Sequence, residues 1–183
     1  MRSRREAPRG AARRGPETKT RYAAFEPVSE DNANVPVIPP VLFATGLAAG
    51  FLLKWLLPVP LFPPRLEGEA CFAGTAISLA GLAFGGWALF TFVRTKTTPH
   101  PNHPVNALVT WGPYRFSRNP MYVGLSVGFV GIALVANTPW ILVALPLVWF
   151  ALRRLVIDRE EAYLTRKFGD EYRTFLARTR RWL

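Results

Sequence analysis

The sequence predicts an all-α membrane protein with about four transmembrane helices and additional helices outside the bilayer. Half of its 183 residues are hydrophobic. From Glu69 to Arg94 the only ionisable side chain between the two ends is Cys71, and from Asn119 to Leu152 all side chains are neutral. A helix in a soluble protein would need a polar face in such stretches, whereas a helix in lipid would not.

Residues 1–36 are rich in Arg, Pro, Ala and Glu and have no apolar periodicity, so we expect a disordered basic cytoplasmic tail. Residues 37–69 are expected to hold the first transmembrane helix, Val41 to about Leu57, and an outer loop whose prolines end that helix. Lys54 near the far end of this helix is expected to extend toward the lipid headgroups.

Residues 70–183 are predicted to form the core of the protein. The second helix, Ala70 to Val93, is long enough to cross a bilayer and carries small residues that allow close helix packing. The apolar run from Pro120 to Ile157 is too long for one crossing, and Asn137-Thr138-Pro139 supplies a turn. We therefore expect a tight helical hairpin with arms Pro120–Ala136 and Trp140–Ile157.

The distribution of basic residues orients these helices. Eight precede the first helix, one lies between the first two, four lie from Arg94 to Arg118, and nine follow from Arg153 onward. The positive-inside rule places both termini and the loop before the hairpin in the cytoplasm. A net charge of +11 beside apolar spans favours an anionic membrane surface over nucleic acid as the partner. One cysteine and two histidines give no expected metal site.

The loop before the hairpin carries the first candidate site. Gly112-Pro113 favours a turn, and Pro120 suits a first helical position, so a helix is expected to begin near Asn119. Its free N–H groups would lie near four polar side chains, and this arrangement suits a carboxylate or phosphate. The four are Tyr114, Arg118, Asn119 and Tyr122. Anchoring of the helix at the headgroups is the alternative interpretation.

The segment from Arg153 to Leu183 is predicted to continue the fourth helix out of the bilayer, with Gly169 ending one helix and Asp170 beginning the next. Glu160 and Glu161 fall one or two turns beyond the membrane boundary, within reach of the loop. As an alternative, they would be surface carboxylates paired with nearby arginines.

Four groups of residues occur in order around the apolar hairpin: Gly112-Pro113-Tyr114-Arg115, then Arg118-Asn119-Pro120-Met121-Tyr122 with Gly124, then Glu160-Glu161, and finally Arg181-Trp182. This order resembles the isoprenylcysteine carboxyl methyltransferase and phospholipid methyltransferase superfamily of integral membrane enzymes, in its bacterial-type form. The resemblance covers roughly residues 70 to 183.

The resemblance implies S-adenosyl-L-methionine as the cofactor, bound on the cytoplasmic side. The cofactor contacts that it implies are Asn106, Ala107, Leu108, Val109, Tyr114, Asn119, Pro120, Met121, Tyr122 and Glu160, and His103 is a further candidate. A helix N-terminus and Arg118 suit the carboxylate of the methionine moiety, and Glu160 suits its ammonium or the ribose hydroxyls.

The implied reaction is methyl transfer to a lipophilic acceptor, with carboxyl methylation of an isoprenylcysteine-like thioether as the first interpretation. N-methylation of a phospholipid amine is the alternative, and a non-catalytic membrane protein that binds a lipid or a partner is the alternative of another class. The candidate catalytic residues are Arg118, Glu161 and Arg154; Val156 stands where the eukaryotic enzymes carry an arginine. No pattern in the sequence sets an oligomeric state.

Overall fold

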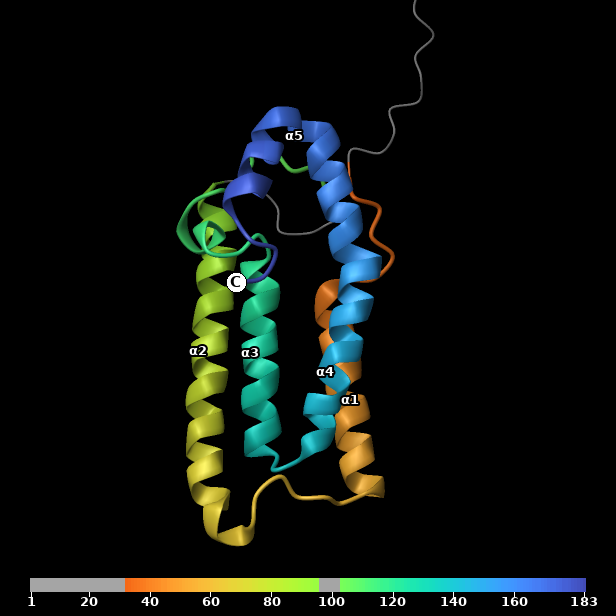
Figure 1. The fold of residues 1–183 in the computed structure, drawn as a ribbon, viewed down its shortest axis with the longest axis vertical. Coiled ribbons are helices and arrows are strands. Elements are labelled where there is room, and N and C mark those ends of the chain that lie inside the picture. The colour runs from red at the N-terminus through yellow and green to blue at the C-terminus, as the bar shows by residue number, and fades with distance from the viewer. Residues whose placement is uncertain (1–31, 96–102) are drawn as a thin grey trace, which may run out of the picture.

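The computed structural model describes residues 32–95 and 103–183, and its regular structure in these ranges is helical (Figure 1). The longer helices are α1 (Pro39–Leu56), α2 (Glu67–Arg94), α3 (Pro120–Val135), α4 (Pro139–Leu152) and α5 (Asp158–Arg178). Short elements connect them: η1 (Pro64–Leu66), η2 (Gly112–Arg115) and the π-helical η3 (Arg153–Ile157). Of the predicted tail, residues 1–31 lie outside the described residues.

The prediction of several apolar helices is confirmed. Three helical runs, Pro39–Leu56, Pro64–Arg94 and Pro139–Arg178, are long and apolar enough to cross a membrane. Helix α3 is apolar as well but shorter. It packs beside α2, and the α3–α4 hairpin turns at the predicted Asn137-Thr138-Pro139 (Figure 1).

Glycines let α2 and α3 approach with their backbones nearly in contact. A Cβ atom on Gly81 would lie 2.6 Å from the carbonyl oxygen of Gly124, and one on Gly74 would lie 2.6 Å from that of Gly131. Only residues without side chains fit at such a separation. This packing fixes the relative positions of the two ends of the loop that connects α2 to α3.

Polar contacts tie α1 and the α1–α2 connection to the tip of the hairpin. Lys54 Nζ donates to the carbonyl of Ala136, 2.7 Å away. That carbonyl belongs to the end of α3, where helical partners are missing. The Asn137 side-chain oxygen accepts from the backbone N–H groups of Leu61 and Phe62.

At the opposite end of the bundle, α4 continues through η3 into α5. Gly169 has a φ of 53° inside α5, so the chain kinks where the sequence predicts a helix end. The second half of α5 then lies over the end of the bundle, and the C-terminus returns to the start of α3 (Figure 1). The α2–α3 loop, α3, α5 and the C-terminal segment, residues 179–183, thus meet in one place.

Candidate functional site

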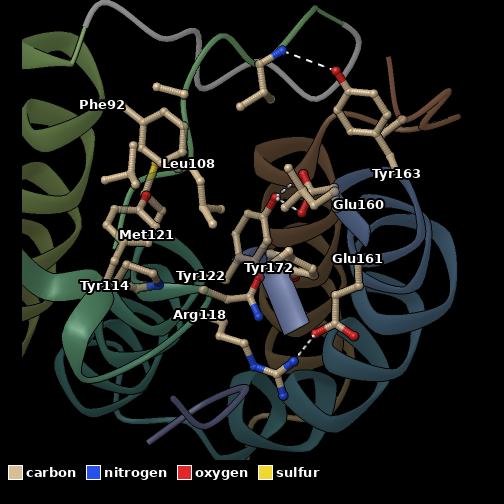
Figure 2. A pocket seen from close by; sticks show the side chains of 17 residues that line it. Phe92, Leu108, Tyr114, Arg118, Met121, Tyr122, Glu160, Glu161, Tyr163 and Tyr172 are labelled. Carbon is tan, nitrogen blue, oxygen red and sulfur yellow. Dashed lines mark hydrogen bonds and ion pairs between the residues drawn. The ribbon is translucent and has the colours of Figure 1, made fainter. Parts of the chain in front are cut away.

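A pocket lies where these elements meet (Figure 2). Its cavity is about 100 Å³. Most of the predicted site residues line it: Ala107, Leu108, Val109, Tyr114, Arg118, Asn119, Pro120, Met121, Tyr122, Glu160 and Glu161. They come from the loop after α2, from the first turn of α3 and from the first turn of α5. The structure therefore brings the loop motif and the Glu160-Glu161 pair together around one cavity.

Three predicted site residues do not line this pocket. His103 and Asn106 are exposed on the loop. Arg154 is exposed on η3, where its guanidinium carbon lies 5.5 Å from the centroid of the Phe150 ring. The structure thus places Arg118, and not Arg154, as the basic side chain that faces the cavity.

Glu160 is the pocket carboxylate that forms no ion pair with the described residues. The Tyr122 hydroxyl donates to it, at 3.0 Å from Oε1 and 3.2 Å from Oε2 (Figure 2). Burial raises the pKa of Glu160 to about 7, the Tyr122 hydrogen bond opposes this shift, and the nearby Glu161 charge adds to it. Glu160 can therefore gain or lose a proton near neutral pH.

Glu161, in contrast, is held by arginine. Arg118 Nη1 donates to its Oε1 at 2.9 Å, and both side chains are largely shielded, with 16% and 17% of their surface exposed. A shielded pair of this kind is less screened by solvent than a surface pair. The Nε of Arg118 is buried and has no hydrogen-bond partner in the described part of the chain.

Tyr114 presents a second buried polar atom without a partner. The residue is 5% exposed, and its ring packs edge-on against Phe92 with 5.1 Å between centroids. Its hydroxyl has no hydrogen-bond partner among the described residues. Burial raises the pKa of this hydroxyl well above its ordinary value, so it stays protonated and can donate. A buried hydroxyl left in this state costs free energy, which a polar ligand group would recover.

The side chain of Asn119 is already engaged within the protein. Its Nδ2 donates to the carbonyl of Arg181 at 3.0 Å, and the adjacent Ser117 hydroxyl donates to the same oxygen at 3.3 Å. Asn119 lines the pocket as the N-cap of α3, and its amide fastens the C-terminal segment there.

Sequence reasoning missed several lining residues: Ala33, Phe92, Val105, Tyr163, Leu164 and Tyr172. Leu164 and Tyr172 recur at helical spacing with Phe168 and Phe175, and this apolar periodicity is the sequence signal for them. Ala33 is 7% exposed and Val35 is 4% exposed, although both fall in the predicted tail. Nothing in their composition distinguishes these two from the polar residues around them.

A second cavity, of about 490 Å³, lies within the bundle beside the first. Its lining is apolar and comes from α1, α2 and α3: Phe43, Leu47, Ser78, Gly81, Leu82, Gly85, Gly86, Leu89, Met121, Gly124, Leu125, Gly128, Phe129 and Ile132. We call it the apolar groove. Met121 lines both cavities, so the polar pocket and the apolar groove meet at this side chain.

Comparison with known proteins assigns the family. An uncharacterized protein of Haemophilus influenzae is 44% identical over 57 residues, which is 28% of this chain and 90% of that protein. No solved structure gives a significant match. The profile described as phospholipid methyltransferase matches residues 70–171, more than half of the chain and including α2, the loop, the hairpin and Glu160-Glu161. The chain therefore belongs to the phospholipid methyltransferase family, whose activity is methyl transfer at a membrane.

Proposed function

We propose that the protein transfers a methyl group from S-adenosylmethionine to a lipophilic acceptor held in the membrane. The observation that carries this proposal is the junction at Met121, where a polar pocket meets an apolar groove. A methyltransferase for lipids needs one site for a polar nucleoside and one for an apolar acceptor, with the reacting atoms at their boundary. The basic residues around the loop and from Arg153 onward support a cytoplasmic orientation of the pocket and of both termini.

The pocket residues fit the polar groups of S-adenosylmethionine, which supplies an electrophilic methyl group on a sulfonium. Arg118 Nε and the Tyr114 hydroxyl are donors beside the start of α3 that have no partner among the described residues, and both suit a carboxylate. One carboxylate oxygen of Glu160 suits the ribose hydroxyls, which leaves its other oxygen for the acceptor. Leu108 and Val109 offer apolar surface for a purine ring. The cavity of about 100 Å³ is smaller than typical ligand pockets of about 300–1,000 Å³, so we expect it to widen on binding.

The apolar groove suits the hydrocarbon part of the acceptor. It is lined by glycines and aliphatic or aromatic side chains, with Ser78 as its polar contribution. The hydrocarbon chain of the acceptor would enter from the lipid between α1 and α2, and the headgroup of the acceptor would then lie near Met121. Burial of apolar surface and exclusion of water near the reacting atoms would both favour transfer.

Of the two acceptor chemistries, the pocket favours an amine. A carboxylate acceptor, such as that of an isoprenylcysteine-like thioether, would need a cation of its own, but Arg154 lies outside the pocket and Arg118 Nε is assigned above to the carboxylate of S-adenosylmethionine. An ammonium headgroup would meet the second oxygen of Glu160, which forms no ion pair with the described side chains, and could transfer a proton to it. The neutral nitrogen would then attack the methyl carbon, and the electron pair of the broken C–S bond would stay on sulfur.

The experiment is a labelled-methyl assay with protein in vesicles that contain either phosphatidylethanolamine or a farnesylated cysteine derivative. We expect label in the phosphatidylethanolamine. The variant Gly86→Leu tests the groove, because a Cβ on Gly86 meets no atom within 4 Å and a larger side chain would enter the groove. We expect it to lower transfer about tenfold or more while S-adenosylhomocysteine still binds.

Label in the farnesylated derivative alone would assign the carboxylate chemistry instead. Absence of label in both acceptors and in a total lipid extract, with no binding of S-adenosylhomocysteine, would favour the non-catalytic alternative. In that case the protein would bind a lipid or a partner without methyl transfer.

A further inference from the structure

The last residues of the chain, 179–183, are fastened to the loop that enters α3, although they lie outside the residues matched by the family profile. The backbone N–H of Arg118 donates to the carbonyl of Arg180 at 2.9 Å. The carbonyl of Arg181 accepts from Ser117 and Asn119, as described above. Three successive residues of the loop thus bond to two successive carbonyls of this C-terminal segment.

The same segment is held from its other side by α4. The indole of Trp182 stacks on that of Trp149, with 5.3 Å between centroids and 18° between ring planes. Trp149 is itself fixed, because its Nε1 donates to the Ser126 hydroxyl at 2.8 Å. Contacts with the loop and with α4 leave the backbone of Arg181 in a defined place next to Asn119, which lines the pocket.

From this place the Arg181 side chain binds Glu161 with both arms of its guanidinium. Its Nε donates to Oε1 at 3.1 Å, and its Nη2 makes a very short contact with Oε2. Its Nη1 lies 3.3 Å from an oxygen of Asp158. Since Arg118 donates to Oε1 as well, two guanidinium groups share the one carboxylate of Glu161.

This sharing decides how Arg118 is oriented. A two-armed contact between arginine and a carboxylate fixes the carboxylate plane, which a lysine cannot do. With Oε2 taken by Arg181, Arg118 contacts Glu161 through Nη1 alone, and its buried Nε keeps no partner. Without Arg181, Glu161 would be free to rotate and to bind Arg118 through both oxygens.

We infer that Arg181 is a positioning residue for the nucleoside co-substrate: it holds Glu161 so that the Nε of Arg118 stays available to a carboxylate in the pocket. This inference rests on the proposed function. It assigns a role to the C-terminal segment in ligand affinity, in addition to any part that the segment has in stability.

The test is calorimetric titration of the full chain in nanodiscs with S-adenosylhomocysteine. We expect Arg181→Ala to weaken binding about tenfold or more. Arg181→Lys should weaken it as well, because a lysine ammonium keeps the charge but cannot make the two-armed contact with Glu161. The matched control is Arg178→Ala, an exposed arginine one turn earlier, which should bind within about twofold of the wild type.

A double-mutant cycle separates an effect of Arg181 that passes through Arg118 from a general effect of Arg181 on the structure of the pocket. In an Arg118→Ala background, Arg181→Ala should cause no further loss of affinity, because its effect passes through Arg118. Additive losses, or affinities of both Arg181 variants within twofold of the wild type, would overturn the inference while leaving the proposed function in place. Failure of the wild type to bind would instead refute the proposed function. If Arg181→Ala proves unfolded by thermal denaturation, Arg181→Lys alone decides the outcome.

Discussion

At the scale of single residues, the pocket contains polar atoms that the protein itself does not satisfy. In the described part of the chain, the Tyr114 hydroxyl and Arg118 Nε are buried without partners, and Glu160 forms no ion pair. Buried polar groups in folded proteins are nearly always paired, so such a cluster is typical of a ligand site.

The variant Tyr114→Phe removes the unpartnered hydroxyl and leaves the ring that packs on Phe92. Folding stability should stay the same or rise by up to about 1 kcal/mol, because an unsatisfied buried group is lost. Affinity for S-adenosylhomocysteine should fall about fivefold or more, since the ligand loses a donor. Thermal denaturation and calorimetry on the same preparation measure both effects. Unchanged affinity would show that this hydroxyl does not face the ligand.

Glu160 makes transfer to an amine depend on pH. Its pKa is raised to about 7 in the folded protein, so at pH 5 the carboxyl is protonated and cannot accept a proton from the acceptor. The rate should therefore rise as pH increases through about 7 and then level off, and Glu160→Gln should remove this rise. Rates at saturating substrate between pH 5 and 8.5 provide the measurement. A flat wild-type profile would exclude Glu160 as the base.

The same shift has a consequence for stability, with the opposite dependence on pH. Because folding raises the pKa from its ordinary value near 4.5, the folded state favours the protonated form. The contribution of Glu160 to stability is thus most favourable below the unfolded pKa and is lost as pH rises through about 7. Glu160→Gln should raise the melting temperature relative to the wild type at pH 8 and change it little at pH 4.5.

At the scale of helices, the contact of α2 with α3 fixes the frame on which the loop is built. A Cβ on Gly124 would lie 2.6 Å from the backbone nitrogen of Gly85, whereas a Cβ on Gly128, one turn later, meets no atom within 4 Å. Gly124→Ala should therefore separate the helices and destabilise the fold by about 1–3 kcal/mol. Gly128→Ala is the matched control and should be neutral. Equal melting temperatures for the two variants would contradict this packing.

The helices are also the part of the structure that sequence predicts well. Charge-free runs, the Pro120 start and the Asn137-Thr138-Pro139 turn give the hairpin almost to the residue, and Gly169 marks the kink of α5. The hydrocarbon environment makes these signals strong, since a lipid-facing helix tolerates few charges. The π-helical η3 has no such signal in the sequence.

At the scale of the whole molecule, the pocket joins residues from Ala33 to Tyr172 and is tied down by the C-terminal segment. The order of the motifs and the family resemblance predict that the loop and the Glu160-Glu161 pair belong to one site. They do not predict Ala33 or the exclusion of Arg154, because distant contacts and side-chain directions follow from tertiary packing. The sequence also does not predict which of the two adjacent carboxylates is paired. Arg118 and Arg181 bind Glu161, whereas Glu160 forms no ion pair with the residues that the structure describes.

The most direct test of the account is calorimetric titration of the wild-type protein in nanodiscs with S-adenosylhomocysteine, which requires no knowledge of the acceptor. We predict saturable binding with a Kd in the micromolar range, equivalent to about −8 kcal/mol. Such binding should weaken in Tyr114→Ala and Glu160→Gln proteins that remain folded. Absence of heat and of any thermal shift up to millimolar ligand, with folded protein, would contradict the assignment of the pocket to the methyl donor.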